Sequence, residues 1–136
     1  MTDTRDYGAL VLRVTLGLLF LAHAGLKIFV FTPAGTAGFF GSLGLPPALA
    51  YVTILAEVAG GLALILGVAV RIVSLALVPL LLGTIAWVHG ANGFWFTGQG
   101  GGWEYPAFWS IALVVQALIG PGAFALRLPR RSSALA

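Results

Sequence analysis

The sequence predicts an all-α integral membrane protein built as a bundle of four transmembrane helices. Of its 136 residues, 60 % are hydrophobic and only 8 % are charged, whereas an ordinary soluble domain is about 25 % charged. The mean hydropathy is +1.03, and four apolar segments approach the roughly 20 residues that a helix needs to cross a bilayer. This composition excludes a water-soluble globule, and the length allows one membrane domain over residues 1–136.

The predicted spans are residues 7–29, 47–67, 71–90 and 105–126. The first resembles a secretory signal, because an apolar run leads to the cleavage-like sequence Ala22-His23-Ala24. Asp3 and Asp6 are unusual at the start of such a signal. Since three more apolar segments follow, we expect the first span to be retained.

The connections between the spans are short or rich in glycine and proline. Residues 36–43 are expected to form a short helix in the membrane interface that ends at Gly44, because their apolar side chains share one side. Residues 67–71 leave room only for a tight turn, which makes the second and third spans antiparallel neighbours. Pro79 is expected to kink the third span without breaking it, because a bilayer offers no alternative to helix.

Seven Lys and Arg against four Asp and Glu give a net charge of +3, which we interpret as membrane topology. Short loops that hold Lys and Arg stay cytoplasmic. The cations predicted on that side are Arg5, Arg13, Arg71, Arg127, Arg130 and Arg131. Only Lys27 falls near the other side, where Trp87, Phe94, Trp95, Phe96, Trp103 and Tyr105 gather. Both termini are therefore predicted to be cytoplasmic, and so few scattered cations predict no nucleic-acid partner.

A faint internal repeat involves the two histidines. A leucine–glycine pair ending at Gly17 precedes His23 at the same distance as the pair ending at Gly83 precedes His89. Coincidence and a true repeat both remain open. A true repeat would relate two helical hairpins of the same orientation, as in parallel-repeat transporters, and would place the two histidines at similar depth.

Glu57 falls near the middle of the second span, where a charged residue costs about 2.5–3.5 kcal/mol on insertion scales. Arg13, His23 and Lys27 share one face of the first span. We therefore expect Glu57 to meet this polar face. The two cations can instead extend to opposite membrane interfaces, but that explanation does not cover His23, whose side chain is short.

Two interpretations of these residues remain open. A buried Glu57 and its partner can simply fix how the helices pack. Alternatively, Glu57 and His23 are catalytic groups that exchange protons, while Arg13 and Lys27 compensate charge where a ligand binds. Proton-coupled reduction of a quinone needs such groups beside an amphiphilic cavity.

The outer loop after the third span holds the second group of candidate ligand-binding residues, His89, Asn92, Glu104 and Tyr105. A glycine-rich run at 98–102 separates the first two from the last two. Such a run can be a flexible linker. The flanking Trp95 and Trp103 favour a loop that folds back over the mouth of the bundle and presents the four side chains to a ligand.

Metal and haem chemistry have little support. The chain has no cysteine, which excludes disulfides, thiolate metal sites and thiol redox relays. No H-x-x-x-H or E-x-x-H spacing occurs, so no metal site is predicted. Haem held by His23 and His89 requires the repeat to be real and is not favoured. No cofactor is certain from the residues, and quinone stays open as one.

Several short motifs occur in a characteristic order along the chain. They are Leu16-Gly17-Leu18-Leu19-Phe20 with His23-x-x-x-Lys27, Ser42-Leu43-Gly44-Leu45-Pro46, Glu57-x-x-Gly60-Gly61, His89-x-x-Asn92-Gly93-Phe94, Glu104-Tyr105-Pro106 and Gly120-Pro121-Gly122. With this order and spacing, the sequence from Leu12 to Gly122 resembles the DoxX family of small four-span bacterial membrane proteins.

The resemblance implies a multi-pass protein of the bacterial inner membrane that is associated with quinone-linked oxidoreduction. Its partners would be the lipid bilayer and either a partner redox protein or further copies of the chain. Whether the chain is itself an enzyme or an oxidoreductase subunit stays open. The alternative is a non-catalytic scaffold or lipid-binding subunit of a redox or other membrane complex, and a small transporter would need oligomers to form a path.

Overall fold

A computed structural model describes residues 3–127, and this part of the chain contains helices and no β-strand. The five α-helices are α1 (Thr4–Gly25), α2 (Pro33–Ser42), α3 (Ala48–Leu66), α4 (Val70–Thr84) and α5 (Glu104–Ile119). Two π-helical turns, η1 (Leu26–Val30) and η2 (Ile85–His89), extend α1 and α4, and a 3₁₀ turn, η3 (Gly90–Asn92), follows η2. The all-α prediction is confirmed.

Three helical stretches are long and apolar enough to cross a membrane, namely Thr4–Val30, Ala48–Leu66 and Val70–Asn92. The fourth apolar helix, α5, has only 16 residues, or about 24 Å at 1.5 Å per residue. The predicted span 105–126 was therefore wrong at its end. Gly120 turns the chain out of the helix with φ 86°, and Pro121 cannot continue it because proline lacks an N–H donor.

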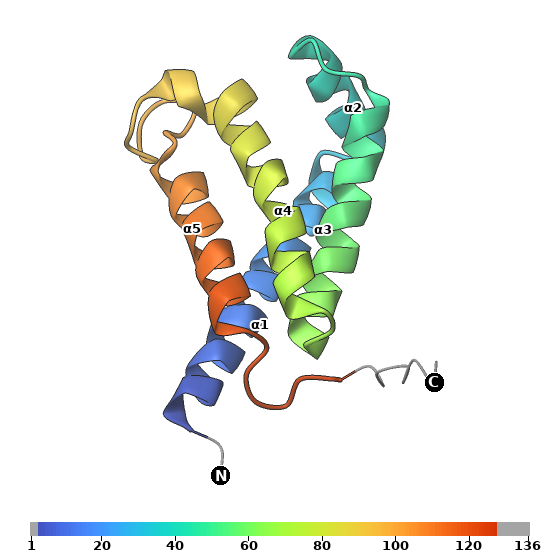
Figure 1. The fold of residues 1–136 in the computed structure, drawn as a ribbon. Helices are drawn as coiled ribbons and strands as arrows, with labels where there is room; N and C mark the ends of the chain where they lie inside the picture. The colour runs from blue at the N-terminus through green and yellow to red at the C-terminus, as the bar shows by residue number, and fades with distance from the viewer. Residues whose placement is uncertain (1–2, 128–136) are drawn as a thin grey trace, which may run out of the picture.

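The helices form two side-by-side pairs, with α1 packed along α3 and α5 packed along α4 (Figure 1). The start of α1, the α3–α4 turn and the segment after α5 lie together at one end of the bundle, which we call the terminal end (Figure 1). There Ala123 N donates to Asp6 O and Leu126 N donates to Leu66 O, both at 3.0 Å. The opposite end, which we call the loop end, holds α2 and the loop between η3 and α5 (Figure 1).

The predicted tight turn between the second and third spans is confirmed. Gly67 adopts φ 78° at the end of α3, and Val68 N donates to Ala63 O at 2.8 Å, which is the pattern of a Schellman motif. In the next helix, α4 continues through Pro79 as expected.

The short helix after the first span begins earlier than predicted. Pro33 occupies the first turn of α2, and Thr32 Oγ1 accepts a hydrogen bond from Gly35 N at 3.1 Å. Both features start a helix, because proline suits the first turn and the threonine oxygen satisfies a free N–H. The predicted end is close, since Leu45 N donates to Phe40 O across Gly44.

Helices α1 and α3 approach each other closely where they cross. A Cβ atom added to Gly17 would lie 2.7 Å from Gly61 O, and one added to Gly61 would lie 2.9 Å from Gly17 O. Glycine at both positions lets the two backbones touch. The core beside this crossing contains Leu16, Phe20, Leu64, Leu77, Leu81, Trp109 and Leu113.

Gly17→Ala is expected to lower the free energy of unfolding by about 1–3 kcal/mol, because the added methyl group forces α1 away from α3. Thermal unfolding of the detergent-solubilised protein measures this effect. Gly8→Ala is the matched control on the same helix, since nothing lies within 4 Å of its added Cβ, and it is expected to be neutral or slightly stabilising. Equal unfolding midpoints for the two variants would show that the crossing tolerates a side chain.

Candidate functional site

Arg13 is 1 % exposed and binds backbone carbonyls from two distant parts of the chain. Its Nε donates to Pro121 O at 2.8 Å and its Nη2 donates to Ala123 O at 2.8 Å. Its Nη1 donates to Leu64 O at 2.9 Å and also to Ile65 O. The guanidinium therefore joins α1 to the last turn of α3 and to the segment after α5, and it lies buried among them.

Arg71 on α4 likewise binds backbone carbonyls of a neighbouring helix, those at the end of α5. Its Nη1 donates to Ala117 O at 2.7 Å and to Leu118 O at 2.9 Å. The last carbonyls of a helix lack intrahelical partners and carry the negative end of its dipole, so a cation there is stabilising. The sequence analysis used Arg71 to set the membrane orientation. Arg71 and the end of the last span were predicted on the same side of the membrane, and this was the available signal that Arg71 caps that helix.

The two helix pairs are thus alike in having an arginine that caps a neighbouring helix. They are also alike in their π-helical turns, since η1 follows α1 and η2 follows α4. His23, however, lies in α1 before its π-helical turn, whereas His89 is the last residue of its own turn. The two histidines therefore do not occupy equivalent positions, although the sequence repeat pairs them.

Glu57 meets the first helix through Lys27, whose Nζ lies 2.8 Å from Glu57 Oε1. The expected contact between Glu57 and a cation of the first span is confirmed. The side chains are 20 % exposed for Lys27 and 2 % for Glu57, so Lys27 points into the bundle and not toward the interface. The other carboxylate oxygen, Glu57 Oε2, is buried and has no hydrogen-bond partner.

Lys27 stands on the π-helical turn η1, in which Phe31 N donates to Leu26 O at 2.8 Å. One extra residue in such a turn rotates the side chains that follow it, and π-helical turns are frequent at functional sites. Nothing in the sequence signals this turn, since residues 26–30 have the composition of an ordinary apolar helix.

His23 lies between these groups and α5. Its Nδ1 is 2.9 Å from Leu19 O, and because a carbonyl only accepts, Nδ1 is the donor of this bond. The His23 ring centroid is 4.8 Å from that of Trp109, and the ring lies within electrostatic range of Glu57. Trp109 is 4 % exposed and its Nε1 has no hydrogen-bond partner.

We call Lys27, Glu57, His23 and Trp109 the inner cluster. It holds one ion pair, one unsatisfied acceptor in Glu57 Oε2 and one unsatisfied donor in Trp109 Nε1. Sequence reasoning missed Trp109. It lies four residues after Tyr105 on α5, and that spacing places both aromatic side chains on one face of the helix.

The outer loop folds back on itself, and three of the predicted ligand-binding residues, His89, Asn92 and Glu104, hold it there. His89 Nδ1 lies 2.8 Å from Gly101 O. Asn92 Nδ2 donates to Gly100 O at 3.0 Å and to Gly101 O at 3.2 Å. Phe96 N donates to Glu104 Oε1 at 3.0 Å. Because of these hydrogen bonds, the loop is not a free linker. The side chains of His89 and Asn92 bind the loop backbone.

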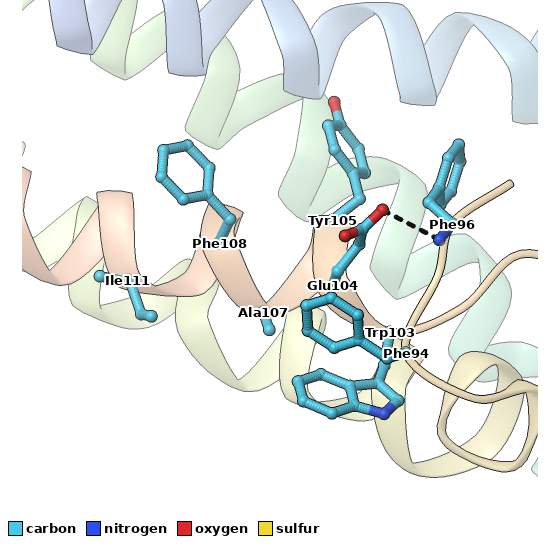
Figure 2. Close-up of a pocket in the computed structure, with 8 residues that line it drawn as sticks. All are labelled: Phe94, Phe96, Trp103, Glu104, Tyr105, Ala107, Phe108 and Ile111. Atoms are coloured by element: carbon cyan, nitrogen blue, oxygen red, sulfur yellow. Dashed lines mark hydrogen bonds between the residues drawn. The ribbon is translucent and has the colours of Figure 1, made fainter.

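Glu104 and Tyr105 line a groove of about 580 Å³ at the start of α5. Figure 2 shows the Glu104 carboxylate turned to Phe96, while Tyr105 and Phe108 project to one side of the helix. The lining residues are Phe94, Phe96, Trp103, Glu104, Tyr105, Ala107, Phe108 and Ile111. The ring of Tyr105 is 5.8 Å from that of Trp109, so neighbouring aromatic rings lead from the groove to the inner cluster.

Known proteins resemble the chain over part of its length. The DoxX family model matches residues 8–90, which is more than half of the sequence. The chain belongs to the DoxX family. The matched part of this DoxX protein includes Arg13, His23, Lys27, Glu57 and His89 but ends before α5.

A protein of Bacillus subtilis (strain 168) named "Putative oxidoreductase CatD" is 41 % identical to this DoxX protein over 85 residues. The similar region covers 62 % of this chain and 62 % of the relative, so the chain spans less than two thirds of that relative's length. No solved structure matches the chain.

Proposed function

We propose that this DoxX protein is a component of a quinone-linked oxidoreductase and binds an apolar, quinone-like ligand in the half of the bundle near the loop end. The observation that carries the proposal is the Lys27–Glu57 ion pair, in which Glu57 is buried, Lys27 is partly buried and the second carboxylate oxygen is unsatisfied. Burying two charges costs several kcal/mol per ion, and a purely structural contact needs neither of them. The name of the Bacillus subtilis relative is consistent with oxidoreduction.

Each residue then has a defined task. Reduction of a quinone consumes two electrons and two protons. Glu57 and His23 exchange the protons, Lys27 holds the carboxylate in place, and Glu104 and Tyr105 line the approach from the bilayer. Arg13, His89 and Asn92 position the helices and the loop, since their side chains are engaged with backbone carbonyls. The electrons come from a partner redox protein.

In the membrane, α1, α3, α4 and α5 are proposed to form four spans, with the terminal end on the cytoplasmic side of the bacterial inner membrane. The positions of Arg5, Arg13 and Arg71 at the terminal end support this orientation. The aromatic side chains of the outer loop then lie at the outer interface, and α2 lies along it. The arginine caps of the two pairs support a parallel internal repeat.

Glu57→Gln tests the function. The variant is expected to fold and to reach the membrane, because glutamine keeps the shape of the side chain, but to lose at least about 90 % of quinone-dependent turnover, since an amide cannot exchange the proton. Turnover is measured as reduction of decyl-benzoquinone by membrane vesicles that contain the native complex. Asp3→Asn is the matched control, because the Asp3 side chain is exposed at the terminal end. Full turnover by a folded Glu57→Gln variant would contradict the proposal.

A scaffold or lipid-binding subunit is the second candidate. This candidate is favoured because several polar side chains hold the helices together. Above all, the Arg13 guanidinium donates hydrogen bonds to four backbone carbonyls. Further copies of the chain or a partner membrane protein would then cover its apolar faces. In that case Glu57→Gln would lower the recovery of folded complex and cause no separate loss of turnover.

A further inference from the structure

The geometry points to a ligand preference of the inner cluster: it favours the reduced, hydroxyl-bearing form of an aromatic ligand over the oxidised, carbonyl-bearing form. The inference rests on the proposed function, because it concerns the same site, and it adds the chemical state of the ligand that the site holds most tightly. It stands on the two unsatisfied atoms, Glu57 Oε2 and Trp109 Nε1.

Glu57 Oε2 needs a donor. The carboxylate already accepts a hydrogen bond from Lys27 Nζ through Oε1, and an ionised carboxylate has no proton to donate. A hydroxyl group on a ligand can donate to Oε2 and satisfy it. A ligand carbonyl in the same place would set two acceptors against each other in a buried site, where an unpaired polar group is costly.

Trp109 Nε1 needs an acceptor, and it does not distinguish the two forms. Both a hydroxyl oxygen and a carbonyl oxygen have lone pairs that can accept the indole N–H. Trp109 therefore contributes affinity for any oxygen-bearing ring. The preference for the hydroxyl-bearing form comes from Glu57 alone.

The charges around the cluster favour an uncharged ligand. Lys27 is neutralised by Glu57, and Arg13 is tied to backbone carbonyls at the terminal end. Within residues 3–127, Arg13 is the buried cation of α1 and Lys27 the partly buried cation of η1, and both are already engaged. An anionic substrate of the complex would have to be bound by the partner protein.

Access to Glu57 requires a side chain to move, because Oε2 itself has almost no exposed surface. Lys27 and His23 are both partly exposed. His23 is held by a hydrogen bond to Leu19 within its own helix, so a change of its rotamer breaks that bond and the ring contact with Trp109 of α5. An aromatic ring arriving from the groove past Tyr105 would take the place next to Trp109.

Glu57→Gln gives a directional test. Lys27 Nζ can only donate, so it keeps the amide oxygen of the variant at the position of Oε1. The amide NH₂ group then occupies the position of Oε2 and offers a donor where the native protein offers an acceptor. The preference for a hydroxyl-bearing ligand should therefore disappear or reverse.

The probes are para-decylphenol and para-decylanisole, which differ in one O–H donor and cannot be interconverted by oxidation. Binding is measured by isothermal titration calorimetry of the full chain in detergent micelles, with empty micelles as the blank. The native protein is expected to bind the phenol about tenfold or more tightly than the anisole. Glu57→Gln is expected to bind the anisole as tightly as the phenol or better, while Asp3→Asn keeps the native ratio.

Equal affinities of the native protein for the two probes, or the same phenol preference in Glu57→Gln, would overturn the inference. If Glu57→Gln fails to fold, the ratio of the phenol and anisole affinities of the native protein still decides the question. The variant Trp109→Phe adds a second test, because it should weaken the binding of both probes without changing the ratio of their affinities. The proposed function fails separately, through quinone-dependent turnover that does not depend on Glu57. A protein can pass either test and fail the other.

Discussion

Replacing Arg13 with methionine is expected to lower the free energy of unfolding by about 3–5 kcal/mol, because hydrogen bonds from charged groups are worth about 1.5–3 kcal/mol each and are not additive. Four backbone carbonyls lose their donor at once, and two of them belong to the segment after α5. Methionine fills part of the space but donates nothing. The expected result is a protein whose terminal end opens well below the native unfolding temperature.

Thermal unfolding in detergent, followed by size-exclusion chromatography, measures this loss. Arg5→Gln is the control, because the Arg5 side chain is 92 % exposed and an exposed ion pair contributes about 0–1 kcal/mol. Arg13→Lys should lie between the two, since an ammonium keeps the charge but cannot span carbonyls that a guanidinium fork reaches. If Arg13→Met unfolds at the same temperature as Arg5→Gln, the guanidinium does not hold the helices together.

The second large effect is expected when the Lys27–Glu57 pair is broken from one side. Lys27→Met leaves the Glu57 carboxylate buried without a counter-charge, and breaking a buried pair in this way costs about 3–5 kcal/mol. The double variant Lys27→Met with Glu57→Met removes both charges and should recover most of that loss, because an apolar pair suits a low-dielectric interior.

A double-mutant cycle on unfolding free energies checks this expectation. The native protein, the two single variants and the double variant are unfolded under identical detergent conditions. A double variant that is more stable than Lys27→Met confirms that the two charges depend on each other. Losses that simply add would mean that Lys27 and Glu57 stabilise the bundle independently.

The fold was largely predictable because a bilayer imposes simple rules. Helix length, apolar composition and turn residues predicted α1, α3 and α4 with small errors at their ends. The end of α5 was misjudged, since the apolar run continues past Gly120 while the backbone leaves the helix there. Composition decides whether a segment prefers lipid, but Gly120 and Pro121 decide where the helix stops.

The candidate site was predictable only in part. A carboxyl group at mid-span requires a counter-charge, and this argument led from Glu57 to the polar face of the first span, on which Lys27 is the cation that it meets. Arg13 has equal charge and shares the same helix face, yet its partners are backbone carbonyls 108 and 110 positions away. Every residue has a carbonyl, so a sequence cannot show which ones a guanidinium will find. For the same reason, the sequence could not show that His89 and Asn92 bind backbone carbonyls of the loop.

The contacts of Arg13 also bear on the order in which the molecule is completed. The first helix leaves the ribosome long before Pro121 and Ala123 are synthesised, and these two residues supply half of the carbonyls that its guanidinium binds. While the nascent chain is being inserted, that cation must keep water or lipid phosphate as a temporary partner. The contacts of Arg13 with α3 can therefore form first, and its last two contacts form only after residues 121 and 123 have been synthesised.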